Sequence, residues 1–225
     1  GVPGGLGDAP SMVGENRLAR MNMIRTFVAV DLDTDLRKTL GRTQVQVKDR
    51  IMQEVLRLAP DVRIQWVRPD AVHLTLKFLG DIAEARVEEI HRALSATVQA
   101  RPRFTVEVKG LGVFPDLRAP RVLWVGLSGQ PGQIDSLVRL AEDVDVALHG
   151  LGFPRELKPF SPHLTLARIK ERSRDVGKAL AGSGLLTQMA SLGSCMVHAV
   201  ALMKSDLKPS GAIYTRLWEV PLGDT

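Results

Sequence analysis

The sequence predicts an α+β fold made of two pseudo-symmetric lobes, with mostly antiparallel sheets, helices outside them and a central cleft. The first observation is a repeat: the phrase His-Leu-Thr-Leu occurs at residues 73–76 and again at residues 163–166. The second is that each copy lies in a half of the chain with the same plan, in the order strand, helix, motif strand, helix, strand. Two such halves favour two layered lobes, and we expect the two motif strands to line the cleft between them.

The first half of the chain begins with a strand-like apolar run, and Asp33 or Thr34 can cap a helix directly after it. Apolar residues recur at helical spacing within residues 85–98, and Gly80 is typical of the end of a strand. The predicted elements are a strand at 26–32, a helix near 34–58, a strand at 64–67, the first motif strand from 73, a helix near 84–99 and a strand at 104–108.

The second half repeats this plan and ends in two further strands. Gly150 is typical of a helix end, and the Lys-Pro-Ser-Gly stretch at 208–211 is typical of a turn. The predicted elements are a strand at 121–127, a helix near 133–149, the second motif strand from 163, a short helix near 172–181 and strands at 195–205 and 213–220. Residues 1–22 lack sustained periodicity and are expected to be a flexible N-terminal extension, followed by one bilobal domain over 23–225.

Each motif puts two kinds of side chain on the two faces of its strand. Successive side chains alternate in direction, so His73 and Thr75 share one face, as do His163 and Thr165, while the leucines share the other. A single histidine on a strand is usually structural, but packing explains only the leucines and not the repeated His and Thr. Two imidazoles and two hydroxyls around one point supply an acid, a base and hydrogen-bond donors, which suits phosphoester chemistry without a metal.

The composition is that of an ordinary globular protein, with 44% hydrophobic and 24% charged residues among 225. No apolar run approaches the ~20 residues that a membrane span needs, so no membrane partner is expected. Cys195 is the single cysteine, which excludes an intramolecular disulfide, argues against zinc and fits a reducing, cytoplasmic location. The net charge of +5 permits a polyanionic partner but fits a solvated basic face equally well.

Longer stretches around the motifs resemble a known family. Two His-x-Thr motifs on paired lobes resemble the 2H phosphoesterase superfamily, and the flanking sequence is similar to the bacterial and archaeal RNA 2′,3′-cyclic phosphodiesterases, historically called 2′-5′ RNA ligases. One departure is Ala71-Val72, where the family often has polar residues, and it leaves the motif intact. The stretches that carry the resemblance are 25–31, 66–80, 112–124, 162–168 and 204–214.

The resemblance implies a cofactor-free, metal-independent enzyme that hydrolyses RNA 2′,3′-cyclic phosphate ends to 2′-phosphomonoesters. It implies that His73 donates a proton to the 3′-oxygen and that His163 accepts one from water, roles that the symmetry of the sequence leaves open. Thr75 and Thr165 would donate hydrogen bonds to the phosphoryl oxygens. RNA with a 2′,3′-cyclic phosphate terminus is then the expected partner of a monomeric protein.

Arg168, at the end of the second motif, is a candidate phosphate ligand because a guanidinium fork matches phosphate oxygens. Strict alternation places Arg168 on the leucine face, so it reaches the cleft only through a strand end or a bulge. The same alternation places Lys77 on the His73 face, although an exposed strand-end lysine is the commoner situation. Phe27 and Trp124 could stack on a base, but core packing is the better interpretation for both.

Other functions stay open at this point. One is a non-catalytic module that binds RNA ends, against which the two intact histidines speak, because binding alone could use Lys or Arg. Another is the same site acting on a small cyclic nucleotide or an ADP-ribose cyclic phosphate. The reverse reaction, RNA ligation through a 2′-5′ bond, uses the same cyclic phosphate and is not distinguished by the residues.

Overall fold

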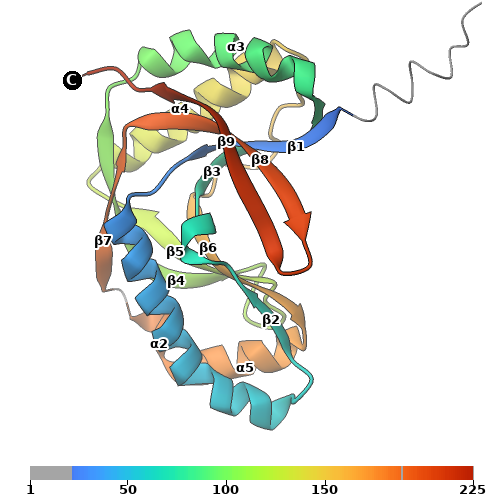
Figure 1. Ribbon diagram of the computed structural model, residues 1–225. Helices are drawn as coiled ribbons and strands as arrows, with labels where there is room; N and C mark the ends of the chain where they lie inside the picture. Colours follow the sequence, from blue (N-terminus) through green and yellow to red (C-terminus); the bar gives the residue numbers. More distant parts are fainter. Residues whose placement is uncertain (1–21, 189, 225) are drawn as a thin grey trace, which may run out of the picture.

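The computed structural model describes residues 22–188 and 190–224, and two antiparallel sheets form its centre (Figure 1), which confirms the predicted α+β class. Almost all of the expected extension at 1–22 lies outside the described residues. The first sheet has the strand order β3 (Leu74–Ala83), β1 (Met23–Val30), β8 (Ala199–Lys208) and β9 (Gly211–Pro221). The second has the order β2 (Arg63–Trp66), β6 (His163–Glu171), β5 (Val122–Ser128), β4 (Phe104–Phe114) and β7 (Ser191–Val197).

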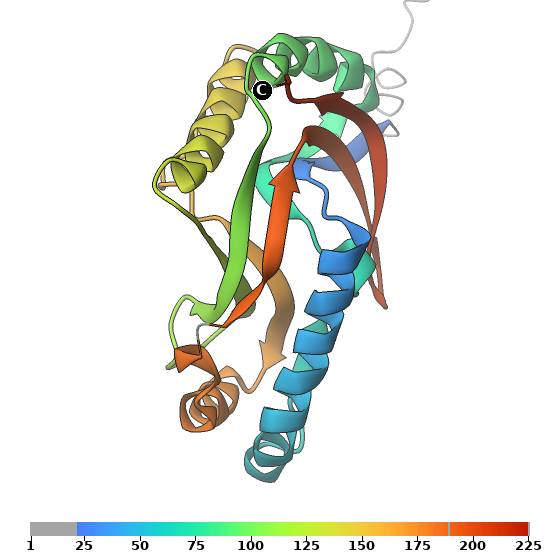
Figure 2. The same ribbon diagram turned by 90° about the vertical axis from the view of Figure 1, so that its left-hand side faces the viewer.

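Two pairs of helices lie at opposite ends of the molecule, as Figures 1 and 2 both show. One pair is α3 (Val87–Gln99), which packs beside β8 and β9 of the first sheet, and α4 (Gln133–His149), which lies against α3 and contacts strands of both sheets. The other pair, α2 (Thr34–Leu58) and α5 (Ser173–Ser183), packs against β5 and β6 of the second sheet. The helices therefore lie outside the sheets, as predicted. Short 3₁₀ turns occur at Pro69–Ala71, Glu84–Arg86 and Leu185–Thr187.

The two lobes do not coincide with the two halves of the sequence. β4, the last strand of the first half, pairs with β5 in the second sheet. Conversely, β8, which belongs to the second half of the chain, pairs with β1 in the first sheet. Helix α2 likewise follows β1 but packs beside α5. Each lobe is thus built from both halves of the chain.

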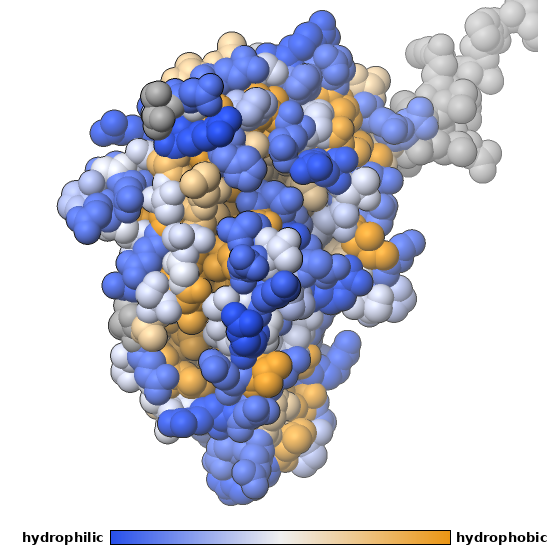
Figure 3. Space-filling view, turned by 60° about the vertical axis from the view of Figure 1, so that its left-hand side comes forward, coloured by the Kyte–Doolittle hydropathy of each residue, from blue (hydrophilic) through white to orange (hydrophobic). Residues whose placement is uncertain are grey.

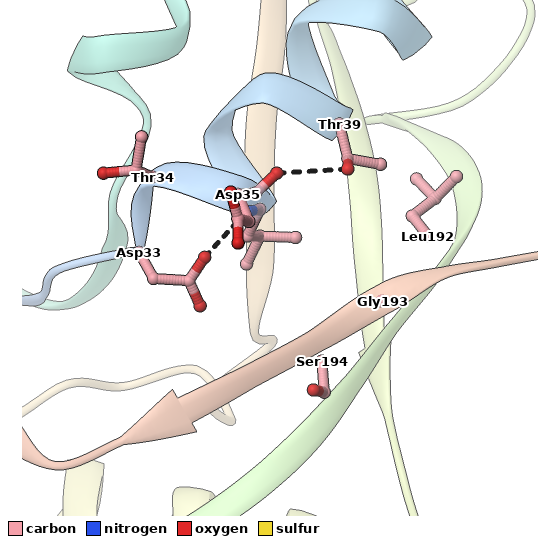
Figure 4. A pocket seen from close by; sticks show the side chains of 8 residues that line it. Asp33, Thr34, Asp35, Thr39, Leu192, Gly193 and Ser194 are labelled. Atoms are coloured by element: carbon pink, nitrogen blue, oxygen red, sulfur yellow. Dashed lines mark hydrogen bonds between the residues drawn. The ribbon is translucent and has the colours of Figure 1, made fainter.

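Helix α2 connects the two hydrophobic cores. Its first turn is capped by Asp33, whose carboxylate accepts a hydrogen bond from the backbone N–H of Leu36 at 2.7 Å (Figure 4). Leu36 and Leu40 belong to the larger core, to which α3 and α4 also contribute. Further along the helix, apolar side chains three to four residues apart enter a second core beside α5; these are Val47, Ile51 and Val55.

Two predicted strands differ from the structure. The predicted strand at 195–205 is two strands, β7 and β8, which lie in different sheets and are separated by His198. The first motif strand continues past Gly80 to Ala83, because Gly80 adopts a positive φ of 72° at an irregularity in its pairing with β1. A glycine read as a strand end is therefore a kink within the strand.

The surface and core agree with the composition. Hydrophilic side chains predominate on the face seen in Figure 3, and apolar ones are interspersed among them. Cys195 is buried in the larger core, which confirms its predicted burial, and this burial raises the pKa of the thiol to about 12. Among the described residues no helix combines the length and the apolar character that a bilayer crossing demands.

Candidate active site

A β-bulge in β6 decides where the second motif points. In its pairing with β5, Thr165 is opposite Trp124 and Ala167 is opposite Leu123, so Leu166 is the extra residue. Leu166 and Ala167 are consequently both buried. The next residue, Arg168, is exposed on the same side as His163 and Thr165 and lines the same cavity as Thr165. The bulge that Arg168 needed to reach the cleft is therefore present.

The same bulge occurs in β3. Thr75 is opposite Ala29 and Lys77 is opposite Val28, so Leu76 is the extra residue. Leu76 and Lys77 are both buried, and Phe78 then emerges with 63% of its surface exposed. Lys77 thus neither shares the face of His73 nor lies exposed, and both expectations for it are wrong. The bulge shifts the alternation by one residue after the motif.

Buried Lys77 forms an ion cluster behind the motif strand. Its Nζ donates to Asp145 Oδ1 at 2.6 Å and to the carbonyl oxygen of Pro154 at 2.8 Å. Arg155 Nε donates to the other carboxylate oxygen of Asp145 at 2.5 Å. Burial alone would raise the pKa of Asp145, but the hydrogen bonds from Lys77 and Arg155 outweigh it, and the pKa lies below its ordinary value. The cluster joins β3 to α4 and to the segment that precedes β6.

Gln44 of α2 holds the bulge of β6 in place. The residue is buried, and its side-chain Nε2 donates to the carbonyl oxygen of Leu166 at 2.9 Å and to that of Val67 at 2.6 Å. The backbone N–H of Val67 also donates to the Leu166 carbonyl, at 2.9 Å. A buried carbonyl without such partners would cost free energy, so Gln44 stabilises the bulge that orients Arg168.

A cavity of about 710 Å³ is lined by strands of both sheets. From the motifs it takes His73, Thr75, Thr165 and Arg168. His163 is not among its lining residues, although it shares the face of β6 with Thr165, which is. The remaining histidines, His91, His149 and His198, do not line it. The structure therefore brings four of the five predicted site residues into one cavity and places the fifth one pleat away.

The cavity is strongly cationic. None of its lining residues is acidic, and five are basic: Arg25, Arg68, Arg168, Lys170 and Lys208. Within the described part of the chain, the acidic residue that forms an ion pair with one of these five is Asp70, 3.3 Å from Arg68. An anion in the cavity would therefore meet cations that are largely uncompensated.

A second cavity, of about 370 Å³, has the opposite character. It lies at the N-terminus of α2 and is lined by Asp33 and Asp35 together with small polar and apolar residues (Figure 4). It contains no residue of either motif and no basic side chain. The chemistry that suits a phosphoester thus gathers in the larger cavity.

The two histidines are oriented by the same backbone contact. Nδ1 of His73 lies 2.9 Å from the carbonyl oxygen of Ala71, and Nδ1 of His163 lies 2.8 Å from that of Ser161. A carbonyl oxygen only accepts, so in each case Nδ1 carries the proton. Nε2 is then the ring atom without a proton when either imidazole is neutral.

The surroundings of the two imidazoles differ. The His73 side chain is 6% exposed, and its Nε2 lies 3.6 Å from Asp31 Oδ1 and 3.5 Å from Arg37 Nη2. Burial lowers the pKa of His73, and Arg37 lowers it further, whereas the Ala71 carbonyl and the carboxylates of Asp31 and Asp70 oppose the shift. Arg37 and Asp31 also pair with each other at 2.5 Å.

His163 instead contacts aromatic rings. Its ring lies 4.9 Å from that of Phe114 in an edge-to-face arrangement and 6.4 Å from that of Trp124. Trp124 in turn lies on Gly112 of β4, where a Cβ atom would clash with the indole ring. Phe27 is buried with Ala29 beneath the cavity, so the expectation that its ring packs in a core is confirmed. Trp124 is half-buried and packs beside Phe114 and His163.

Sequence reasoning missed several residues of this site. Asp31 and Arg37 are ordinary charged residues in the sequence, and only the fold brings them to His73. Phe78 and Lys170 become cavity residues through the bulges. One signal was available: Leu166-Ala167 puts two apolar residues in succession, which breaks the alternation and is typical of a bulge.

Comparison with known proteins agrees with this geometry. The protein family described as "LigT like phosphoesterase" matches this chain over residues 43–124 and 129–214. The chain belongs to the LigT-like phosphoesterase family. This confirms the resemblance to the 2H phosphoesterases that the motifs indicate, and with it the assignment of the chain as an enzyme of this family.

Individual relatives cover most of the chain. The RNA 2′,3′-cyclic phosphodiesterase of Methanothermobacter thermautotrophicus is 34% identical over 193 residues, which are 85% of this chain and 95% of that protein. The enzyme of the same name from Aeropyrum pernix is 37% identical over 161 residues, 71% of this chain and 86% of its own. A crystal structure from Thermus thermophilus is 27% identical, with a TM-score of 0.67 over 89% of this chain and 99% of that one.

Proposed function

We propose that this protein hydrolyses RNA 2′,3′-cyclic phosphate ends to 2′-phosphomonoesters by acid–base catalysis with two histidines and no metal. The observation that carries the proposal is the cationic cavity, to which both motif strands contribute. Relatives that span most of the chain bear the name of this activity. The buried thiol of Cys195 agrees with the proposed cytoplasmic location.

In the proposed reaction a water oxygen attacks the phosphorus atom and the bond between phosphorus and the 3′-oxygen breaks. His163 Nε2 takes the proton of the attacking water, and His73 Nε2 gives a proton to the departing 3′-oxygen. The product carries a 2′-phosphate and a free 3′-hydroxyl. One neutral and one protonated imidazole complete the step without other groups that transfer protons.

Three further side chains would stabilise the charge on the phosphoryl oxygens. The hydroxyls of Thr75 and Thr165 lie one pleat from the two histidines and line the cavity. Arg168, turned into the cavity by its bulge, supplies a guanidinium fork that matches two phosphate oxygens. Fixed donors of this kind act where charge develops, because they need no reorganisation during the reaction.

If His73 is the proton donor, its imidazole must be protonated when the substrate is bound. Its lowered pKa means that the imidazole is mainly neutral at pH 7 in the free protein. A bound phosphodiester anion next to Nε2 favours the protonated form, so substrate binding itself would supply the acid. We therefore expect the pKa of His73 to rise when inorganic phosphate is bound.

The assay that tests the function uses RNA with a 2′,3′-cyclic phosphate end in the presence of EDTA. We expect hydrolysis to continue and the product to be the 2′-phosphomonoester. Loss of activity in EDTA with recovery on adding a divalent ion would refute the metal-independent mechanism, and a 3′-phosphate product would refute the assigned direction of cleavage. Binding of the RNA without turnover would favour a module that only binds RNA ends. A 2′-5′ linked product from RNA ends supplied together would reveal ligation.

A further inference from the structure

We propose that the cavity continues into a groove for the nucleotides on the 5′ side of the cyclic phosphate, so that the enzyme acts on a single-stranded RNA end in preference to a mononucleotide. This inference rests on the proposed function, since it specifies the length of substrate that the same site accepts. Three features carry it: the distribution of positive charge, a set of exposed apolar side chains, and the hairpin arm formed by residues 205–214 at the ends of β8 and β9.

The positive charge extends well beyond the motifs. Arg168 and Lys170 follow Thr165 along one face of β6 and line the cavity beside it. Arg25 lies near the start of β1, and Lys208 lies at the tip of the arm. A cyclic phosphate carries a single negative charge, which Arg168 and Lys170 on β6 can neutralise. Cations on other elements of the same cavity fit the successive phosphates of a nucleic acid chain.

Exposed apolar side chains lie among these cations. Phe78 is 63% exposed, Leu207 is 70% exposed and Ile213 is 44% exposed, and all three line the cavity. Large apolar groups that gather in a basic cavity fit the faces of nucleobases, which stack on aromatic rings and pack on aliphatic groups. In an A-form duplex the bases are stacked on each other, so this surface fits an unpaired strand.

The arm forms one wall of the groove. β8 pairs with β1 only from Ala201 to Lys204, and beyond this point it pairs with β9 alone. The arm therefore projects past the first sheet (Figure 1). At its tip, a Cβ atom on Gly211 would lie 3.3 Å from Nε2 of Gln65, which belongs to β2 in the other sheet. The arm thus spans the cavity from one sheet to the other and carries Lys208, Leu207 and Ile213 with it.

The first test compares two substrates. We expect kcat/KM for a five-nucleotide RNA with a 2′,3′-cyclic end to exceed that for the matching cyclic mononucleotide by about 10-fold or more, which corresponds to one additional charged or stacking contact. The advantage should shrink as salt is raised, because phosphate contacts release counterions. Equal kcat/KM values for the two substrates would overturn the inference while leaving the proposed function intact. Hydrolysis of neither would refute the proposed function instead.

The second test removes the two distant cations. In the double variant Arg25→Gln/Lys208→Gln, we expect the ratio of the two kcat/KM values to fall toward one. The slope of log kcat/KM against log salt for the five-nucleotide RNA should flatten by about 1.4, since each phosphate contact on a single strand contributes about 0.7. Lys38→Gln/Arg139→Gln is the charge-matched control, because both residues lie on helices and neither lines the cavity. The control should keep the wild-type ratio and slope.

A binding measurement makes the inference testable without turnover. The probe is the same five-nucleotide RNA ending in a 2′-phosphate, labelled with fluorescein at its 5′ end and followed by anisotropy. We expect the double variant to bind it about 10-fold more weakly than the wild type and the control variant to bind it as the wild type does. If the double variant and the charge-matched control weaken binding equally, net charge and not a groove accounts for the effect, and the inference is wrong.

Discussion

The two motifs have the same four residues and the same bulge, but their surroundings differ: His73 lies just before β3, whereas His163 is the first residue of β6. β3 is the edge strand of its sheet, whereas β6 lies between β2 and β5. Behind the bulge, β3 buries Lys77 and β6 buries Ala167. After the bulge, β3 presents Phe78 to the cavity and β6 presents Arg168. Repetition thus extends to the geometry of the backbone, while the residues on either side of the bulge have diverged.

The difference suggests a division of labour across the cavity. The repeated part, His and Thr, supplies the groups that the proposed chemistry needs on both sides of one phosphate. The residues after the bulge have diverged: Arg168 places a positive charge on one wall, and Phe78 places an apolar ring on the other. The charge suits a phosphate, and the ring suits a base. A binding site for an asymmetric ligand can in this way arise from two symmetric strands.

The largest expected effect tests whether the two motifs act together. Replacing either His73 or His163 with Ala should lower kcat by roughly 10²–10⁴-fold, the usual contribution of general acid–base catalysis. The double variant should lose far less than the product of the two single losses, because the histidines act in one step. Steady-state kinetics on folded variants checks this. A single variant with near-wild-type turnover would remove that histidine from the mechanism and break the symmetry of the comparison.

The next effect concerns the buried residues behind the bulges. Lys77→Met should lower the free energy of unfolding by about 3 kcal/mol, because the buried charge of Asp145 then keeps only the Arg155 ion pair and the backbone N–H of Glu156. Urea denaturation measures the loss, and Lys170→Met, on the exposed face of β6, is the control.

This stabilisation also has a defined pH dependence. The pKa of Asp145 is lowered in the folded protein, so its contribution is present above the ordinary value of 3.8 and is lost as the pH falls through the lowered one. The difference between wild type and Lys77→Met should therefore narrow at acid pH. A difference that is small at pH 7, or constant down to acid pH, would contradict the role of the cluster.

A smaller effect is expected from the threonines. Thr75→Val and Thr165→Val keep the β-branched shape and delete one donor, which should raise the barrier by up to about 3 kcal/mol. The pH dependence of kcat should change little, since the groups that transfer protons stay in place. If neither substitution changes kcat/KM, the two strands do not act on one phosphate, even if both histidines are essential.

The smallest effect sharpens the contrast between the histidines. Arg37→Gln should raise the pKa of His73, because it removes a nearby positive charge, and Asp31→Asn should lower it. The imidazole resonances of His73, followed by NMR against pH, measure both shifts, and those of His163 serve as the internal reference. Tyr214 and Phe27 contact the His73 ring in both variants, so the substitutions differ in the charge that they remove and should act in opposite directions. Shifts of the same sign would mean that the substitutions act through structure and not through charge.

The alternation of His and Thr against Leu was sufficient to predict the faces of both motif strands and the α+β class, because period-2 patterns and helical spacings are local properties. The positions of Lys77 and Phe78 were not predicted, because a bulge inserts one residue and inverts the pattern after it. The division of the predicted 195–205 strand at His198 was also missed, since both parts are apolar and only their pairing partners differ.

In the candidate site, too, the residues in local patterns could be predicted and those brought together by the fold could not. His73, Thr75, Thr165 and Arg168 could be named from the sequence, and the structure places them in one cavity. Gln44, Asp31 and Arg37 could not, because their partners lie on other elements and no local pattern links them. The arm forms one wall of the cavity, and its approach to β2 could not be predicted because it brings together strands of different sheets.

The exchange of β4 and β8 between the halves restricts how this enzyme can move. The chain passes between the two sheets repeatedly, and the larger core joins Val28 and Leu74 of the first sheet to Val125 and Leu164 of the second. Parting the sheets would expose this shared core to water. The two sheets therefore cannot close about a hinge as two rigid bodies, as the lobes of many enzymes do, because they share one core. The arm pairs with the first sheet only at its base, so it is a wall of the cavity that can shift without parting the two sheets.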